Sequence, residues 1–250
     1  MNILVFDTET TSLEKPFCYN VGFVIYNTDE GKVVASADYV IEQVWHNLPL
    51  FSSAYYAEKR PLYVNRMRAR ICVMDKWGYV MQRMLRLIRE YNVTDAYAYN
   101  SKFDEKVFAF NCDWYKVSNP LDTLAVHDIR GYVHKFFAFK PRYQQFCEEH
   151  ELYTESGNYS TTAEAVFRFI LNDNDFTEEH TALADSEIEC IILGQCIDEG
   201  GEWNMDYKVY NSIPRVVSKV LTVTDTEGKN HCFPYQKIRV NKEKTEIKLK

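Results

Sequence analysis

The sequence predicts an α/β domain followed by a small β-rich appendage. Strand-like apolar runs alternate with helical patterns up to about residue 198, and this alternation is typical of α/β folds. Beyond Gly200 and Gly201, short strand-like runs are separated by polar turns. We therefore divide the chain into a domain of residues 1–200 and an appendage of residues 201–250.

The elements of the domain follow from local patterns, taken in chain order. Residues 3–10 are predicted to form a strand, because an apolar run at 3–6 leads directly into two acids. A polar turn at 27–32 joins the next two strands, which suggests an antiparallel meander. Apolar side chains at helical spacing predict a helix over 76–91. The predicted strands are 3–10, 18–26, 33–41 and 96–99. The predicted helices are 76–91, 104–111, 123–131, 141–150, 161–171 and 182–197.

Two basic stretches have two interpretations each. Residues 44–73 lack periodicity, are rich in aromatic residues and carry five basic side chains against one acid. Such a segment can line a groove for nucleic acid, and a solvated surface insertion explains it equally well. The appendage, with predicted strands at 216–224, 231–233, 237–240 and 246–249, ends in a stretch (236–250) of local charge +4. That stretch fits a nucleic-acid or protein contact, or an ordinary exposed terminus.

Composition limits the function classes. The 250 residues are 46% hydrophobic, enough for a packed core, and no run approaches the ~18 apolar residues of a membrane span. No secretory signal precedes the first strand, and seven scattered cysteines indicate reduced thiols of a cytoplasmic protein, without a zinc motif. The net charge of −7 argues against a protein that coats nucleic acid, but it does not exclude an enzyme that grips one end of a strand.

The first strand ends in two acids on one face. Side chains alternate along a strand, so Asp7 and Glu9 point the same way, about 7 Å apart. Their repulsion is relieved by solvent, protonation or a cation, and Mg²⁺ or Mn²⁺ suits oxygen ligands best. The alternative is a strand whose end is acidic without function.

Further acids and one histidine occur later in the chain. Asp104 begins a helix three residues after Ser101, so a capping box is the best explanation of this acid taken alone. His180 and Asp185 would lie roughly 140° apart on one helix, given 100° per residue. They converge only if His180 sits in the loop before the helix and Asp185 in its first turns.

Together these pieces resemble a known family. Residues 6–11 (FDTETT), residues 99–104 (YNSKFD), and His180 followed five residues later by Asp185 resemble the three motifs of the DEDDh 3′→5′ exonucleases. That family includes the proofreading epsilon subunit of bacterial DNA polymerase III, oligoribonuclease and RNase T. The resemblance covers residues 1 to about 198.

The resemblance implies a ribonuclease-H-like fold, with a mixed five-stranded sheet flanked by helices. It implies that two Mg²⁺ or Mn²⁺ ions are held by four acids and that His180 takes the proton of the attacking water. The implied metal ligands are Asp7, Glu9, Asp104 and Asp185. The implied substrate-binding residues are Thr10, Ser12, Leu13, Asn100 and Phe103. Ser12 departs from the family, which often has glycine in this loop, so the fit of the terminal nucleotide is in doubt.

We therefore expect a cytoplasmic exonuclease that releases nucleoside 5′-monophosphates from the 3′ ends of single-stranded DNA. An exoribonuclease that trims RNA ends is the alternative. The expected partners are nucleic-acid 3′ ends and, through proofreading, a replication protein, but no membrane. A catalytically dead nucleic-acid-binding adaptor is disfavoured, because such a module could lose any of the four acids or the histidine without losing its fold.

Overall fold

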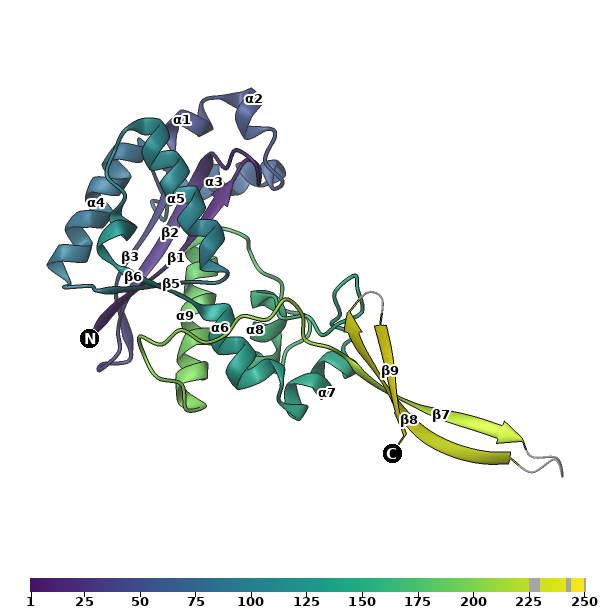
Figure 1. The fold of residues 1–250 in the computed structure, drawn as a ribbon. Helices are drawn as coiled ribbons and strands as arrows, with labels where there is room; N and C mark the ends of the chain where they lie inside the picture. The colour runs from purple at the N-terminus through teal and green to yellow at the C-terminus, as the bar shows by residue number, and fades with distance from the viewer. Residues whose placement is uncertain (225–229, 242–243, 250) are drawn as a thin grey trace.

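The computed structural model describes residues 1–224, 230–241 and 244–249, with side chains described up to residue 215. Its strands form two separate sheets (Figure 1). The strands are β1 (Asn2–Thr10), β2 (Cys18–Asn27), β3 (Lys32–Ile41), β4 (Val73–Asp75), β5 (Asp95–Ala98), β6 (Ala125–Asp128), β7 (Val216–Thr224), β8 (Asn230–Asn241) and β9 (Lys244–Leu249).

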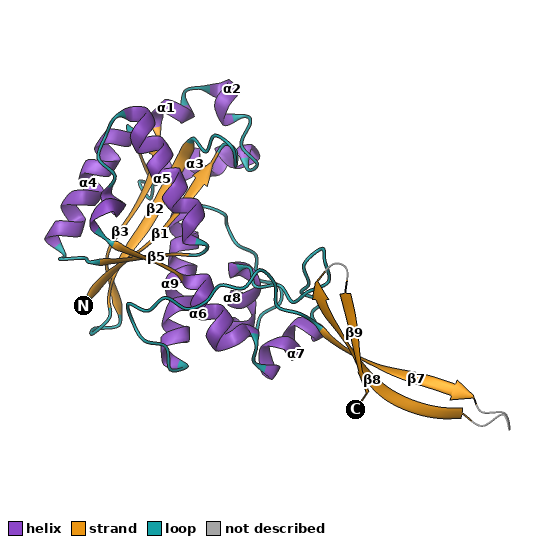
Figure 2. Cartoon of the chain, viewed as in Figure 1, coloured by secondary structure: helices purple, strands orange, loops and turns teal. Residues whose placement is uncertain are grey.

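Helices cover the first sheet on both faces (Figure 2). They are α1 (Glu42–Trp45), α2 (Leu48–Phe51), η1 (Ala57–Lys59), α3 (Arg60–Arg68), α4 (Trp77–Glu90), α5 (Ser101–Tyr115), η2 (Pro120–Thr123), α6 (Ile129–Val133), η3 (His134–Ala138), α7 (Pro141–Glu149), α8 (Ala163–Leu171) and α9 (Ala182–Asp198). Within the described part of the chain, no helix combines the length and the hydropathy needed to cross a membrane.

The first sheet is mixed, as predicted, but has six strands in the order β4-β3-β2-β1-β5-β6 instead of five. β1, β2 and β3 form the predicted antiparallel meander, whereas β5 and β6 continue from β1 in parallel. β4 pairs with β3 in parallel and lies at the end of the segment that showed no periodicity. Three residues are too few for alternation to be visible in the sequence.

The helix predicted over 123–131 is wrong in its first half. Here β6 pairs in parallel with β5, from Asp95 opposite Ala125 to Ala98 opposite Asp128, and α6 begins only afterwards. The Asp128 side chain accepts a hydrogen bond from the Arg130 amide and caps α6. Pairing with a buried strand outweighs the short local helical pattern, because helix propensity is a weak preference.

Alternate residues of β1 enter two different cores. Leu4 and Phe6 pack with α4 and α5, where the Phe6 and Phe108 rings lie 5.4 Å apart. Ile3 and Val5 pack on the opposite face with α6, α8 and α9. The buried strand is thereby fixed in register, since a shift by one residue would exchange the two faces.

Residues 199–215 return along the domain after α9. Trp203 and Tyr207 pack against the core that contains Tyr97 and Tyr132. β7, β8 and β9 then form the predicted appendage, an antiparallel sheet separate from the first. The segments predicted as strands at 231–233 and 237–240 belong to the single strand β8. The basic side chains of 236–250 lie outside the described side chains, and the domain division at residue 200 stays a prediction.

The start of α9 rests directly on Gly22 of β2. A Cβ atom at Gly22 would lie 2.0 Å from the Leu183 amide nitrogen and 2.1 Å from the Ala182 carbonyl carbon. Only glycine permits this approach of two backbones. Gly22 thus sets the position of the first turn of α9.

We predict that Gly22→Ala destabilises the protein by about 3 kcal/mol or more, the upper range for carbon atoms inserted into a packed interior. The matched control is Gly194→Ala in α9, where an added Cβ meets nothing within 4 Å and should stabilise the helix by up to ~1 kcal/mol. Denaturant unfolding of both variants checks this. Equal stability of Gly22→Ala and wild type would contradict the close packing.

Candidate active site

Three carboxylates meet at the end of β1. Asp7 and Glu9 occupy alternate positions of the strand, and Asp185 lies in the first turn of α9. One carboxylate oxygen from each residue lies within 4.8 Å of the other two. They meet because Asp7 lies opposite Gly22 in the β1–β2 pair, and α9 begins against that glycine.

Asp104 reaches the same place from the other side of β1. Thr8 Oγ1 donates a hydrogen bond to Asp104 Oδ1 at 2.6 Å, and the Asp104 side chain is buried. The capping-box interpretation is not observed, because α5 begins after Asn100 without a side-chain cap and Ser101 Oγ donates to Glu105 instead. Asp104 is close enough to raise the pKa of Asp7.

Burial and mutual repulsion favour the neutral forms of these acids. Burial, then the carboxylate of Asp104, raises the pKa of Asp7 well above its usual range. Burial and the Asp185 carboxylate raise the pKa of Glu9 to about 8. Burial raises the pKa of Asp104 to about 7 against the Thr8 hydrogen bond, and that of Asp185 to about 7 against the charge of Lys59.

Two acids of this region were missed in the sequence. Glu189 is buried, and its carboxylate accepts the Tyr99 amide at 3.2 Å. Burial and the carboxylates of Asp104 and Asp185 raise the pKa of Glu189. Its spacing of four residues after Asp185 places both on one helix face and could have indicated it. Glu178 is the other, with a pKa raised to about 8 by burial and by Asp185.

His180 lies in the loop before α9, as the angular argument predicts. Its ring stacks on Tyr56, with centroids 4.6 Å apart, and Nδ1 lies 3.7 Å from Glu178 Oε2. Burial and the positive charge of Lys59 lower the pKa of His180. The imidazole is therefore neutral at pH 7 and able to accept a proton. The His180 backbone amide also hydrogen-bonds to the Asp185 carboxylate.

A cavity of about 300 Å³ opens beside the carboxylates. Its lining residues are Thr8, Glu9, Thr10, Thr11, Ser12, Leu13, Tyr55, Tyr56 and Phe103. Four of the five predicted substrate-binding residues are among them. Asn100 is not; it takes a left-handed conformation with φ 63°, and its amide donates to Asp128 Oδ1.

The segment 44–73 contributes two aromatic rings, Tyr55 and Tyr56, to the lining of this cavity, and two of its cations lie over aromatic rings of the same segment. Tyr55 is 84% exposed and Tyr56 packs beside it. Lys59 Nζ lies 4.5 Å from the Tyr56 ring centroid, and the Arg60 guanidinium lies 4.2 Å from the Trp45 ring centroid. The segment is therefore part of the wall of the site.

Ser12 adopts a conformation that does not require glycine. Its φ lies outside the left-handed region. Ser12 Oγ donates to the Lys15 carbonyl at 3.0 Å and accepts from the Lys15 amide at 3.2 Å. The serine closes the loop with its own side chain, so the loop is ordered without a glycine at this position.

The donor set fits divalent cations. Asp185 Oδ1 is one of the buried polar atoms that have no hydrogen-bond partner among the described residues. It belongs to a cluster of hard oxygen ligands whose repulsion a cation would relieve. Asp7, Glu9 and Asp185 could hold such an ion, with Asp104 beside them. The individual roles of these residues stay predictions.

Comparisons with known proteins identify the fold. No protein-family model and no curated protein matches the sequence. The nuclease domain of 3'hExo, a DEDDh family member solved with bound rAMP, matches with a TM-score of 0.51 at 13% identity, over 84% of this chain and 96% of that one. E. coli Exonuclease I in complex with a dT13 oligonucleotide matches with a TM-score of 0.53 at 15% identity. The match covers 80% of this chain but 41% of Exonuclease I. The resemblance to the DEDDh exonucleases is thus confirmed in the fold.

The raised pKa values predict how stability depends on pH. Between the unfolded pKa near 4 and its raised folded value, Asp7 binds more protons in the folded state, so metal-free wild type loses stability as pH rises. Asp7→Asn cannot ionise. We expect the variant to melt a few degrees above wild type at pH 8 with chelator, roughly 2–4 °C per kcal/mol, and the difference to shrink towards pH 5.

Calorimetric melting temperatures across this pH range provide the measurement. Mn²⁺ should reverse the order at pH 8, because an ion that binds only the folded wild type stabilises it. A difference between the two proteins that does not change with pH would show that Asp7 ionises as it does in the unfolded chain.

Proposed function

We propose that this protein is a metal-dependent 3′→5′ exonuclease acting on single-stranded DNA. The observation that carries the proposal is the convergence of Asp7, Glu9 and Asp185 with Asp104 at the end of β1, with His180 at the rim. The fold shared with the nuclease domain of 3'hExo supports it. RNA is the second candidate substrate, because that structure holds rAMP whereas the Exonuclease I complex holds a DNA oligonucleotide.

In this proposal, the role of each residue follows from its position in the site. Asp7, Glu9 and Asp185, with Asp104, hold divalent cations, which when bound supply a Lewis acid for the phosphodiester and activate water. His180, neutral at pH 7, accepts the proton of the attacking water. The water oxygen forms a bond to phosphorus while the bond from phosphorus to the 3′ oxygen of the penultimate nucleotide breaks, and that oxygen takes up a proton from solvent to become the new 3′-hydroxyl. The products are a nucleoside 5′-monophosphate and a chain shortened by one nucleotide.

The cavity receives the terminal nucleotide in this proposal. Thr10, Ser12, Leu13 and Phe103 line it, and its volume of about 300 Å³ is at the lower end of small-molecule sites. Leu13 and Tyr55 are strongly exposed beside it. An exposed aromatic ring can stack on a base without sequence preference, which suits the trimming of strands of any sequence. Proofreading and a replication partner stay predictions.

We predict that wild type with Mn²⁺ shortens 5′-labelled single-stranded oligonucleotides one nucleotide at a time, and that chelator abolishes this. Asp7→Ala should lose about 10³-fold or more in kcat, since metal ions contribute several kcal/mol to catalysis. Asp113→Ala, which changes an exposed acid of α5, is the matched control and should keep wild-type activity.

Denaturing gels on DNA and RNA of one sequence provide the measurement and rank the two substrates. An oligonucleotide that carries a 3′-phosphate tests whether degradation begins at a free 3′ end. If neither polymer is shortened with Mn²⁺, the enzyme proposal fails; if Asp7→Ala is as active as wild type, the assignment of the site fails.

We predict that His180→Ala loses about 10²–10⁴-fold in kcat but retains the Mn²⁺ affinity of the cluster of Asp7, Glu9 and Asp185, to which the histidine does not belong. His180 lies instead in a second group that could hold an ion, together with Glu164 and Glu178. Isothermal calorimetry and single-turnover rates give the two quantities. His46→Ala, at an exposed position, is the control. Collapse of Mn²⁺ affinity in His180→Ala would make His180 a metal ligand instead of a base.

A further inference from the structure

The backbone of His180 is held in a conformation that its own sequence does not favour. Its φ is +51°, in the left-handed region that residues with a Cβ seldom adopt. Such a conformation persists where the surroundings impose it. The His180 side chain is 28% exposed and stacks on Tyr56, and the residues on either side of His180 are restrained by further polar contacts.

Glu179, directly before His180, is held by two cations from the segment 44–73. Arg66 Nη1 donates to Glu179 Oε1 at 2.7 Å, and Lys59 Nζ donates to the Glu179 carbonyl at 2.6 Å. Thr181 Oγ1, on the other side of His180, donates to the same Glu179 oxygen at 3.0 Å. The Glu179 carboxylate therefore links the residue before His180 to Thr181, the residue after it.

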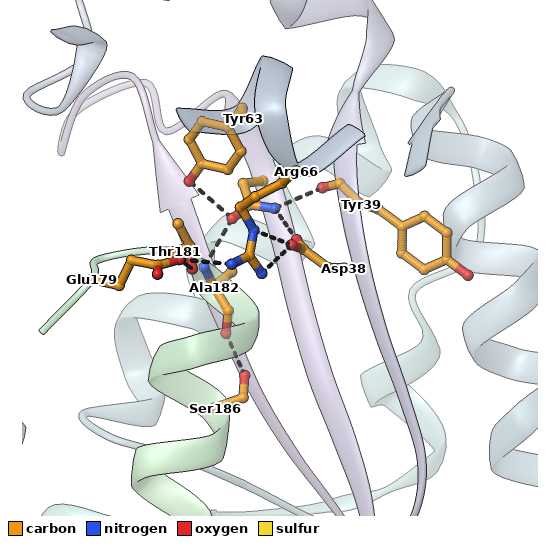
Figure 3. A network of polar contacts seen from close by, with 9 residues as sticks. Asp38, Tyr39, Tyr63, Arg66, Glu179, Thr181, Ala182 and Ser186 are labelled. Atoms are coloured by element: carbon orange, nitrogen blue, oxygen red, sulfur yellow. Dashed lines mark hydrogen bonds and ion pairs between the residues drawn. The ribbon is translucent and has the colours of Figure 1, made fainter. Parts of the chain in front are cut away.

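Arg66 is itself fixed to the sheet (Figure 3). Its Nε and Nη2 donate to Asp38 Oδ2 at 3.2 and 2.9 Å, and the Asp38 side chain is fully buried. Asn20 Nδ2 donates to Asp38 Oδ1 at 2.6 Å, while Asn20 Oδ1 accepts the Ala182 amide at 2.8 Å. The network thus connects Glu179, before His180, with Ala182, the first residue of α9, by way of Arg66, Asp38 and Asn20.

We propose that Glu179, gripped by Arg66 and Lys59, is the positioning residue for His180. It belongs neither to the carboxylate cluster nor to the cavity lining. Besides burial, its negative charge also raises the pKa of Asp185, and Glu179→Gln, which removes that charge but keeps the acceptor oxygen, separates this effect from the positioning of the histidine. Arg66 is 14% exposed and Glu179 is 43% exposed, so the pair is partly screened by solvent, and the burial of Arg66 against Asp38 fixes its geometry. This inference rests on the proposed function, in which His180 is the base.

The test changes Glu179, because Arg66→Ala would leave the buried Asp38 carboxylate without its cation. Glu179→Ala should lower kcat on single-stranded DNA with Mn²⁺ by about tenfold, with KM within about twofold, since a displaced base costs turnover and not binding. Glu179→Gln, whose amide oxygen still accepts from Arg66, should retain at least about half of kcat.

Glu199→Ala is the matched control. Glu199 is 34% exposed and paired with Arg142, whereas Glu179 is 43% exposed and paired with Arg66. Its kcat should equal that of wild type, while its melting temperature should change as little as that of Glu179→Ala. Unchanged kcat in Glu179→Ala, an equal loss in Glu179→Gln, or a rise in KM alone would each overturn the proposal.

A second readout does not depend on activity. The imidazole resonances of His180 in the metal-free protein should shift in Glu179→Ala and stay in place in Glu199→Ala. If wild type shortens no nucleic acid, the proposed function fails, while the resonances still decide whether Glu179 fixes the histidine. Resonances of His180 identical in wild type and Glu179→Ala would refute the positioning role.

Discussion

Mutual repulsion among buried carboxylates is the constraint on which the rest of this structure depends. Asp7, Glu9, Asp104, Asp185 and Glu189 share one region, and burial together with neighbouring negative charge raises the pKa of four of them, Asp7, Glu9, Asp185 and Glu189. For Asp104, burial is the largest cause, and the negative charge comes from Asp128. Such a cluster opposes folding above neutral pH, so the apolar packing on both faces of β1 must offset it. The apolar packing therefore offsets the destabilising effect of the carboxylates. Bound protons or cations would reduce their mutual repulsion.

Side chains of β1 alternate between its two faces, so the strand contacts α9 on one face and α5 on the other. Asp7 follows the parity of Ile3 and Val5, on the face covered by α9, which carries Asp185. Thr8 follows the parity of Leu4 and Phe6, on the face covered by α5, and binds Asp104. The threonine between two acids is therefore as necessary to the arrangement as the acids, since its hydroxyl fixes the one carboxylate that arrives from the opposite layer.

The sequence predicts those parts of the site that depend on local geometry. The alternation of side chains along a strand predicts that Asp7 and Glu9 share one face. The rotation of 100° per helical residue predicts that His180 must precede α9 if it is to lie near Asp185, and the structure places it in that loop. β4 and β6, of three and four residues, were missed because strand pairing decides so short a segment. The contacts of Lys59 and Arg66 with Glu179 span 120 and 113 residues, and only the folded chain brings these residues together.

The way α3 is attached explains why it suits a positioning role. Tyr63 is its one buried residue, and the Tyr63 hydroxyl donates to Asn20 Oδ1. Val64 and Met67 also pack against the apolar core, and Tyr63 and Arg66 add directional polar contacts to the sheet. A satisfied buried hydrogen-bond network specifies one arrangement. Because Tyr56 of the same segment both lines the cavity and stacks on His180, a substrate that moves this ring acts directly on the surroundings of the histidine.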